Sequence, residues 1–92
     1  MPLQSIEIIA RSLDQCDLAE KRIKQVLVTL SMENKAHYTC EIRKSTDLRK
    51  IERFSAGVNL PLIIINGVLE YSGRLPEPQP LKLKLWNVIR FG

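Results

Sequence analysis

The sequence predicts an α/β protein with a four-stranded mixed sheet and helices on both faces. Short runs rich in β-branched residues, longer stretches with apolar residues at helical spacing, and an Asn66-Gly67 pair between two strand-like runs lead to this fold class. The predicted order is β-α-β-α-β-β-α. Its strand-helix-strand unit implies a parallel pair with a right-handed crossover, and the hairpin adds an antiparallel strand.

The first half of the chain supplies a strand, a helix and a second strand. Residues 5–10, SIEIIA, predict the first strand. Residues 18–30 carry apolar side chains at helical spacing, with Asp14 as the predicted N-cap. The apolar stripe of this helix extends back to Cys16, so we expect its thiol to face the sheet. Residues 36–42 alternate between apolar and polar and predict the second strand.

The second half supplies the remaining helices and the hairpin. Residues 45–47 offer an N-cap for a short helix that carries Leu48, Ile51 and Phe54 at helical spacing and ends near Gly57. The run 62–65 and the run 68–72 flank the Asn-Gly pair and predict an antiparallel hairpin. After a loop with three prolines, residues 81–91 predict the last helix.

Length, composition and charge predict a single domain over residues 1–92 of an ordinary soluble protein. The apolar and charged fractions are 45% and 26%. Residues 1–10 lack the features of a signal peptide, and no apolar run is long enough to span a bilayer, so we expect a cytoplasmic location and no membrane partner. The net charge is +4, but the most basic stretch, residues 43–53, is interrupted by acidic residues and has no aromatic platform. We therefore expect a solvated helix face there rather than nucleic-acid binding.

The cysteines and the single histidine argue against a metal site. Cys16 and Cys40 are far apart in sequence, and with one histidine they cannot complete a standard four-ligand zinc site. We expect free thiols in a reducing compartment, no bound metal and no cofactor.

A proline opens the third predicted strand and connects the sequence to a known family. Residue types leave the isomer of Pro61 open, and base rates favour trans. However, the segment 58–74, with Val-x-x-Pro before an apolar strand, then Asn-Gly, then Ser-Gly-Arg-Leu-Pro over residues 72–76, resembles the thioredoxin fold and, more closely, the small redox-active disulfide family. The resemblance covers nearly the whole chain. It implies a cis bond at Pro61 and a substrate groove shaped by the backbone beside it, including Leu60.

The main departure from that family lies at the start of the first helix. The family has a CxxC motif there, whose first cysteine attacks a disulfide and whose second resolves the mixed intermediate. Here the four residues are Leu-Asp-Gln-Cys, so Leu13 occupies the attacking position and Cys16 the resolving one. The other register, with Cys16 as attacker and Ala19 as the lost partner, places Arg22 on the apolar stripe and is disfavoured.

Three functions follow as hypotheses, and the third is self-association or a role as a partner subunit, with apolar surface left by Leu13 and the strand edge forming the contact. Thiol-disulfide exchange needs an attacking thiolate and a second thiol, so the first hypothesis is a binding or structural module without dithiol chemistry that uses the groove near Pro61. Its candidate binding residues are Leu13, Asp14, Gln15, Leu60 and Pro61. The alternative is a monothiol redox protein in which Cys16 is catalytic and forms mixed disulfides with glutathione or a partner protein. The helix N-terminus favours ionisation of Cys16, whereas nearby carboxylates and burial oppose it. The sequence identifies neither the protein or peptide partner nor the oligomeric state.

Overall fold

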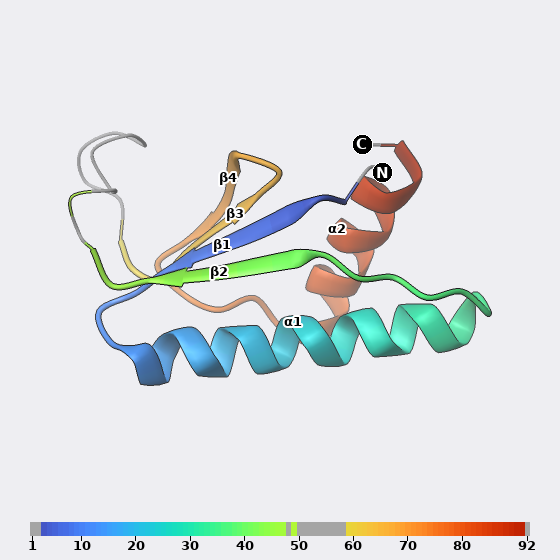
Figure 1. Cartoon of the computed structure of the whole chain (residues 1–92), viewed down its shortest axis with the longest axis horizontal. Helices are drawn as coiled ribbons and strands as arrows, with labels where there is room; N and C mark the ends of the chain where they lie inside the picture. Colours follow the sequence, from blue (N-terminus) through green and yellow to red (C-terminus); the bar gives the residue numbers. More distant parts are fainter. Residues whose placement is uncertain (1–2, 48, 50–58, 92) are drawn as a thin grey trace.

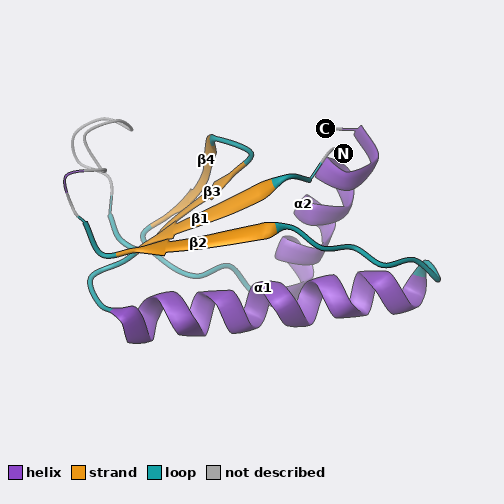
Figure 2. Cartoon of the chain, in the orientation of Figure 1, coloured by secondary structure: helices purple, strands orange, loops and turns teal. Residues whose placement is uncertain are grey.

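A computed structural model describes residues 3–47, 49 and 59–91 of the chain. It is an α/β structure in which two helices pack on a four-stranded mixed sheet (Figures 1 and 2). The elements are β1 (Ser5–Ile9), α1 (Leu13–Glu33), β2 (Glu41–Ser45), β3 (Leu62–Ile65), β4 (Val68–Ser72) and α2 (Pro78–Phe91). Of the short helix predicted from Leu48 to near Gly57, only residue 49 is among the described residues, so this helix stays a prediction.

The sheet has the mixed topology that the sequence predicts. Its strand order is β2-β1-β3-β4, with β1 and β2 parallel and the other neighbours antiparallel. Helix α1 is the crossover between the two parallel strands. The neighbouring strand β3 pairs with β1 from Ile6 opposite Ile65 to Ile9 opposite Leu62.

The β3–β4 hairpin confirms the turn prediction. Asn66 and Gly67 have φ angles of 51° and 84°, the left-handed values that a two-residue hairpin turn requires and that asparagine and glycine adopt at low cost. The Asn66 side chain has a further contact: its Oδ1 accepts hydrogen bonds from the backbone N–H groups of Gln4 at 2.8 Å and Ser5 at 3.1 Å. These two hydrogen bonds connect the turn to the start of β1.

Helix α1 begins earlier than predicted, and the prediction of Asp14 as its N-cap is wrong. Ser12 caps the helix, because its Oγ accepts a hydrogen bond from the Gln15 N–H at 3.3 Å. The Gln15 side-chain oxygen in turn accepts from the Arg11 N–H at 3.1 Å. This reciprocal arrangement resembles a capping box and leaves Asp14 in the first turn, where its charge suits the helix dipole.

Strand β2 lies further along the chain than predicted. The predicted strand over residues 36–42 shares only its last two residues with β2, which begins at Glu41. The ladder with β1 starts where Ser5 pairs with Glu41 and where the Glu41 N–H donates to the Gln4 carbonyl at 3.1 Å. Residues 37–40 run beyond the start of β1 and therefore have no partner in the described sheet.

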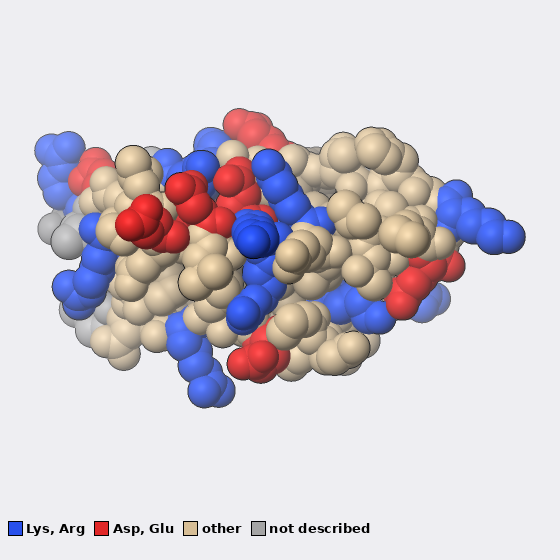
Figure 3. All heavy atoms as spheres, turned by 90° about the horizontal axis from the view of Figure 1, so that it is seen from below, with Lys and Arg blue, Asp and Glu red and all other residues tan. Residues whose placement is uncertain are grey.

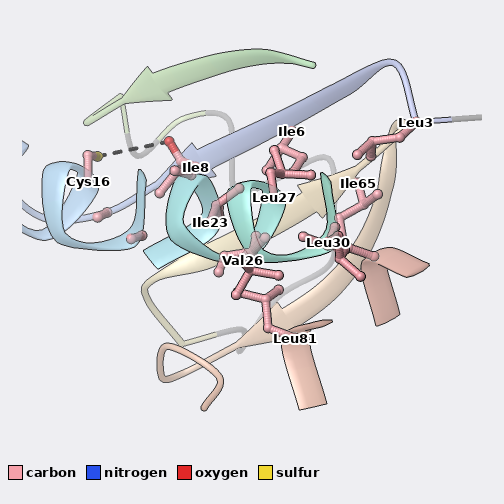
Figure 4. Packing of buried hydrophobic residues seen from close by; sticks show 14 residues of the cluster. Leu3, Ile6, Ile8, Cys16, Ile23, Val26, Leu27, Leu30, Ile65 and Leu81 are labelled. Carbon is pink, nitrogen blue, oxygen red and sulfur yellow. Dashed lines mark hydrogen bonds between the residues drawn. The ribbon is translucent and has the colours of Figure 1, made fainter. Parts of the chain in front are cut away.

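The main core lies between the sheet and the two helices (Figure 4). Helices α1 and α2 pack on the same face of the sheet and contact each other. Fully buried residues in this layer include Ile6, Ile8, Ile23, Leu81 and Leu85. The two described helices cover one face of the sheet, and a helix on the other face stays a prediction within the described residues.

The opposite face of the sheet carries a smaller apolar cluster. It consists of Ile9, Leu62 and Ile64, with Leu60 and Leu69 packed against it. The run Leu62–Ile65 is buried throughout, as a continuous β-branched run on a central strand predicts.

Helix α2 begins three residues before the predicted start. Its first residue is Pro78. Proline is favourable there because the N–H of the first helical residue forms no hydrogen bond within the helix, so the N–H that proline lacks is not needed. On its buried side, Trp86 meets the ring of Tyr38 edge to face, with the ring centroids 6.1 Å apart. Neither α1 nor α2, the helices of the described segments, is long and apolar enough to cross a membrane.

Candidate functional site

One end of the sheet brings together the segments that the sequence singles out. Because Ile9 pairs with Leu62, Ala10 and Pro61 lie just beyond the paired strands at this same end. The Ala10 N–H donates to the Ser45 carbonyl at 3.1 Å, which places the end of β2 there as well. Helix α1 starts from this end, at the left of Figure 1.

The turn at Leu60–Pro61 lies at this end of the sheet. The Leu60–Pro61 peptide bond is cis, the isomer that the family resemblance implies. The Pro61 carbonyl accepts a hydrogen bond from the Gly73 N–H at 3.1 Å, which joins the turn to the end of β4. Both Leu60 and Pro61 are half-buried. Within the described residues, no hydrogen bond of the Leu60 backbone is present.

The first turn of α1 lies at the same end of the sheet, and its side chains are either exposed to solvent or buried in the core. Leu13 is 62% exposed, and Asp14 and Gln15 are exposed beside it. The side-chain amide oxygen of Gln15 is engaged within the chain, because it accepts a hydrogen bond from the Arg11 N–H. Cys16 is 0% exposed. Leu13, which stands where the family resemblance expects an attacking cysteine, is therefore exposed to solvent, and Cys16 is buried in the core.

The Cys16 thiol points from α1 into the sheet, as the apolar stripe of the helix predicts (Figure 4). Its Sγ lies 3.6 Å from the Ser45 carbonyl oxygen and 4.0 Å from the Ile8 carbonyl oxygen, so the S–H is directed to backbone acceptors of β1 and β2. Burial raises the pKa of the Cys16 thiol above its ordinary value, and the negative charge of Asp17 acts in the same direction. A neutral, buried thiol is a poor nucleophile.

Lys44 links β2 to α1 beside this thiol. Its Nζ lies 2.8 Å from Asp17 Oδ1 and 3.1 Å from Glu20 Oε1, and these hydrogen bonds raise the pKa of Lys44. Figure 3 shows acidic side chains gathered over the first half of α1. The sequence places Lys44 only in a basic stretch, because its partners become visible once the register of β1 with β2 is known.

The second cysteine lies at the opposite end of β2. Cys40 directly precedes the strand, whereas Cys16 contacts Ser45 at the strand's last position. A strand rises about 3.3 Å per residue, so β2 holds the two cysteines well beyond the Cα separation of about 7 Å that a disulfide tolerates. Both thiols are free. The site therefore contains one thiol rather than a dithiol pair.

Neither a metal centre nor a known relative supplies a function for this site. Across residues 3–47, 49 and 59–91, no three side chains of the metal-ligating types come together. Comparisons with known protein families, curated proteins and solved structures gave no match for this chain. Function must therefore be inferred from the geometry of the site itself.

Proposed function

We propose that this protein is a thioredoxin-fold binding module without dithiol chemistry, whose ligand lies against Leu13 and the Leu60–Pro61 turn. The observation that carries this proposal is the contrast within the first turn of α1. Leu13 is 62% exposed at the position of an attacking cysteine, whereas Cys16, three residues later, is fully buried.

The arrangement of the strands supports the thioredoxin-fold part of the proposal. A parallel strand-helix-strand unit is followed by an antiparallel hairpin in the same sheet, with a proline one residue ahead of the first hairpin strand. This is the arrangement that the sequence resemblance implies. A fold does not by itself supply a function, so the site residues carry the rest.

The chemistry of the site argues against disulfide turnover. Exchange begins with a thiolate that can reach a substrate disulfide, and it ends when a second thiol releases the product. The Leu13 side chain can do neither. Cys16 is buried with a raised pKa, so a mixed disulfide at this residue requires the first turn of α1 to open. The same burial weighs against the monothiol alternative.

The surface of the site suits an extended peptide with an apolar side chain. Leu13 offers exposed apolar area, and Leu60 and Pro61 add half-buried apolar area at the same end of the sheet. The Leu60 N–H and carbonyl can pair with a peptide backbone in the manner of an added strand. Side-chain contacts with Leu13 would then select the peptide sequence.

A disulfide-reduction assay tests the chemical half of the proposal. The chain and a dithiol thioredoxin are compared at equal concentration on the same protein disulfide, with a common reductant. We expect no turnover above the reductant background for this chain. Turnover comparable to that of the thioredoxin would overturn the proposal.

Peptide selection tests the binding half. Peptides are selected from a random display library on the intact protein, and affinities are then measured for Leu13→Glu and Leu83→Glu. These two leucines are each 62% exposed, but Leu83 lies on α2. We expect Leu13→Glu to weaken binding about tenfold or more, as loss of a buried apolar contact does, and Leu83→Glu to leave it unchanged. Equal affinities for both variants would place the ligand elsewhere.

A further inference from the structure

Strand β2 forms one edge of the sheet, and its outer side is the basis of this inference. The strand order is β2-β1-β3-β4, and in the described part of the chain β2 pairs only with β1 (Figure 2). An edge strand presents N–H and carbonyl groups that can pair with another chain. None of the proposed ligand-binding residues lies on this edge, so the two sites are independent.

The hydrogen bonds to β1 determine which residues of β2 face outward. The Glu41 N–H donates to the Gln4 carbonyl, and the Ser45 carbonyl accepts from Ala10. In a parallel ladder alternate residues of one strand bond to the same neighbour, so the backbone groups of Ile42 and Lys44 point away from β1. Any further strand that pairs with this edge must therefore form its hydrogen bonds with the backbone groups of Ile42 and Lys44.

The side chains of β2 divide between the two faces of the sheet. Ile42 packs on the core beneath α1, and Lys44 reaches α1 through its ion pairs. Glu41 and Arg43 project from the opposite face, where their side chains are 66% and 60% exposed and lie 3.4 Å apart at the closest N–O pair. One exposed face of the edge therefore carries a negative charge and, two residues later, a positive charge.

We propose that β2 pairs antiparallel with β2 of a second copy of this chain, with Ile42 opposite Ile42 on the two-fold axis. This register joins the outward backbone groups and sets each Glu41 opposite Arg43 of the other copy. Because only alternate residues can form these hydrogen bonds, the next possible registers shift one strand by two residues along the other. These registers place Glu41 opposite Glu41 or Arg43 opposite Arg43 of the second copy. Opposite charges across strands stabilise and like charges destabilise, so charge complementarity selects this register. The product is a continuous sheet across both copies.

The helix side of the edge offers apolar surface for the same contact. A groove of about 540 Å³ lies between α1 and the segment that leads into β2, and Val28, Met32, Tyr38 and Ile42 contribute to its lining. Val28 and Met32 are among the exposed large apolar residues of the chain. Figure 3 shows a broad uncharged surface over the C-terminal half of α1. A second copy with Ile42 on the axis brings its own α1 toward this groove.

The sequence pattern ahead of β2 is a separate argument for a missing strand partner. Residues 36–42 alternate as a strand does, and the half-buried Tyr38, Cys40 and Ile42 pack against the core, yet residues 37–40 form no ladder. In the proposed register Cys40 pairs with Lys44 of the second copy. Dimerisation would thereby extend the ladder into the strand-like segment that β1 leaves unpaired.

Charge reversal tests this interface without disturbing the core. Sedimentation velocity is measured over a concentration series for the parent chain, Glu41→Arg and Arg43→Glu, with Glu77→Arg and Arg74→Glu as exposed controls of equal charge change. We expect a dimer for the parent chain and both controls. Each β2 variant should raise the dimer dissociation constant about tenfold or more, because each places two like-charge pairs across the axis.

Mixing the two β2 variants distinguishes a contact between copies from an effect within one chain. Glu41→Arg carries two positive charges on its edge and Arg43→Glu two negative charges, so the mixture should form a heterodimer that is tighter than the homodimer of either variant. A parent chain that stays monomeric up to about 1 mM overturns the proposal. So does a dimer that both β2 variants leave intact, or a mixture that stays monomeric.

Discussion

The two cysteines of this chain meet different environments. Cys16 lies in the core, with its thiol directed to carbonyls of β1 and β2. Cys40 is half-buried in a segment that forms no ladder, beside the groove at the β2 edge. Burial raises the pKa of both thiols, but only Cys16 is cut off from solvent. The cysteine that the sequence connects to redox chemistry is therefore the less accessible one.

Placing a cysteine at position 13, where the proposed function expects an attacking cysteine, should have the largest effect. Leu13→Cys places an exposed thiol in the first turn of α1, where the helix N-terminus lowers a thiol pKa, and Cys16 three residues later can act as its resolving partner. We expect turnover in the disulfide-reduction assay to rise from background to a measurable rate, with a reversible disulfide between residues 13 and 16.

Leu18→Cys is the matched control for this gain of activity. Leu18 is 59% exposed on the same helix but lies beyond the first turn. This variant should form adducts with oxidised glutathione and show no turnover. Equal rates for the two variants would mean that Leu13 does not occupy a degenerate dithiol site.

Replacing Cys16 by serine should lower the free energy of unfolding more than replacing Cys40 does. Cys16→Ser introduces a hydroxyl into the apolar core, with acceptors placed for the longer C–S bond, so we expect the free energy of unfolding to fall by about 1–3 kcal/mol. Cys40→Ser should cost less than about 1 kcal/mol, because that site is partly solvated. Urea denaturation of both variants measures the difference, and equal losses would contradict the assigned burial.

Alkaline pH should produce the smallest effect. The folded pKa of Cys16 is raised, so its contribution to stability is complete below the unfolded thiol pKa of about 8.5 and is lost as pH rises through the folded value. The stability difference between the parent chain and Cys16→Ser should narrow above about pH 8.5, by at most about 1.4 kcal/mol per pH unit. Tyr71 and Lys44 also have raised pKa values, but they titrate in both chains and cancel in the difference.

Strong local signals let the sequence predict the hairpin and the inward direction of Cys16. Asn66 and Gly67 are among the few residue types that adopt positive φ cheaply, and four β-branched or leucine residues before them match a buried central strand. The apolar stripe of α1 places Cys16 correctly because helical spacing depends on the chain alone. These features need no knowledge of distant partners.

The elements that were predicted wrongly depend on competing or distant partners. Asp14 is a good capping residue, but Ser12 together with Gln15 forms a two-way cap, a Ser-x-x-Gln signal that the sequence contains. The bounds of β2 follow from which residues find β1 opposite them, and alternation cannot reveal this. Likewise, the link from Lys44 to Asp17 and Glu20 depends on sheet register rather than on sequence spacing.

The reactivity of Cys16 is the most direct test of the central claim that its thiol is structural. Its alkylation rate is measured against pH in the folded Cys40→Ser chain, so that a single thiol reports, and is compared with the rate in denaturant. We predict a rate at least about 10³-fold below that of the unfolded chain, because a fully buried thiol reacts only through opening. A fast rate with a midpoint well below about pH 8.5 would contradict the account and favour a monothiol redox protein.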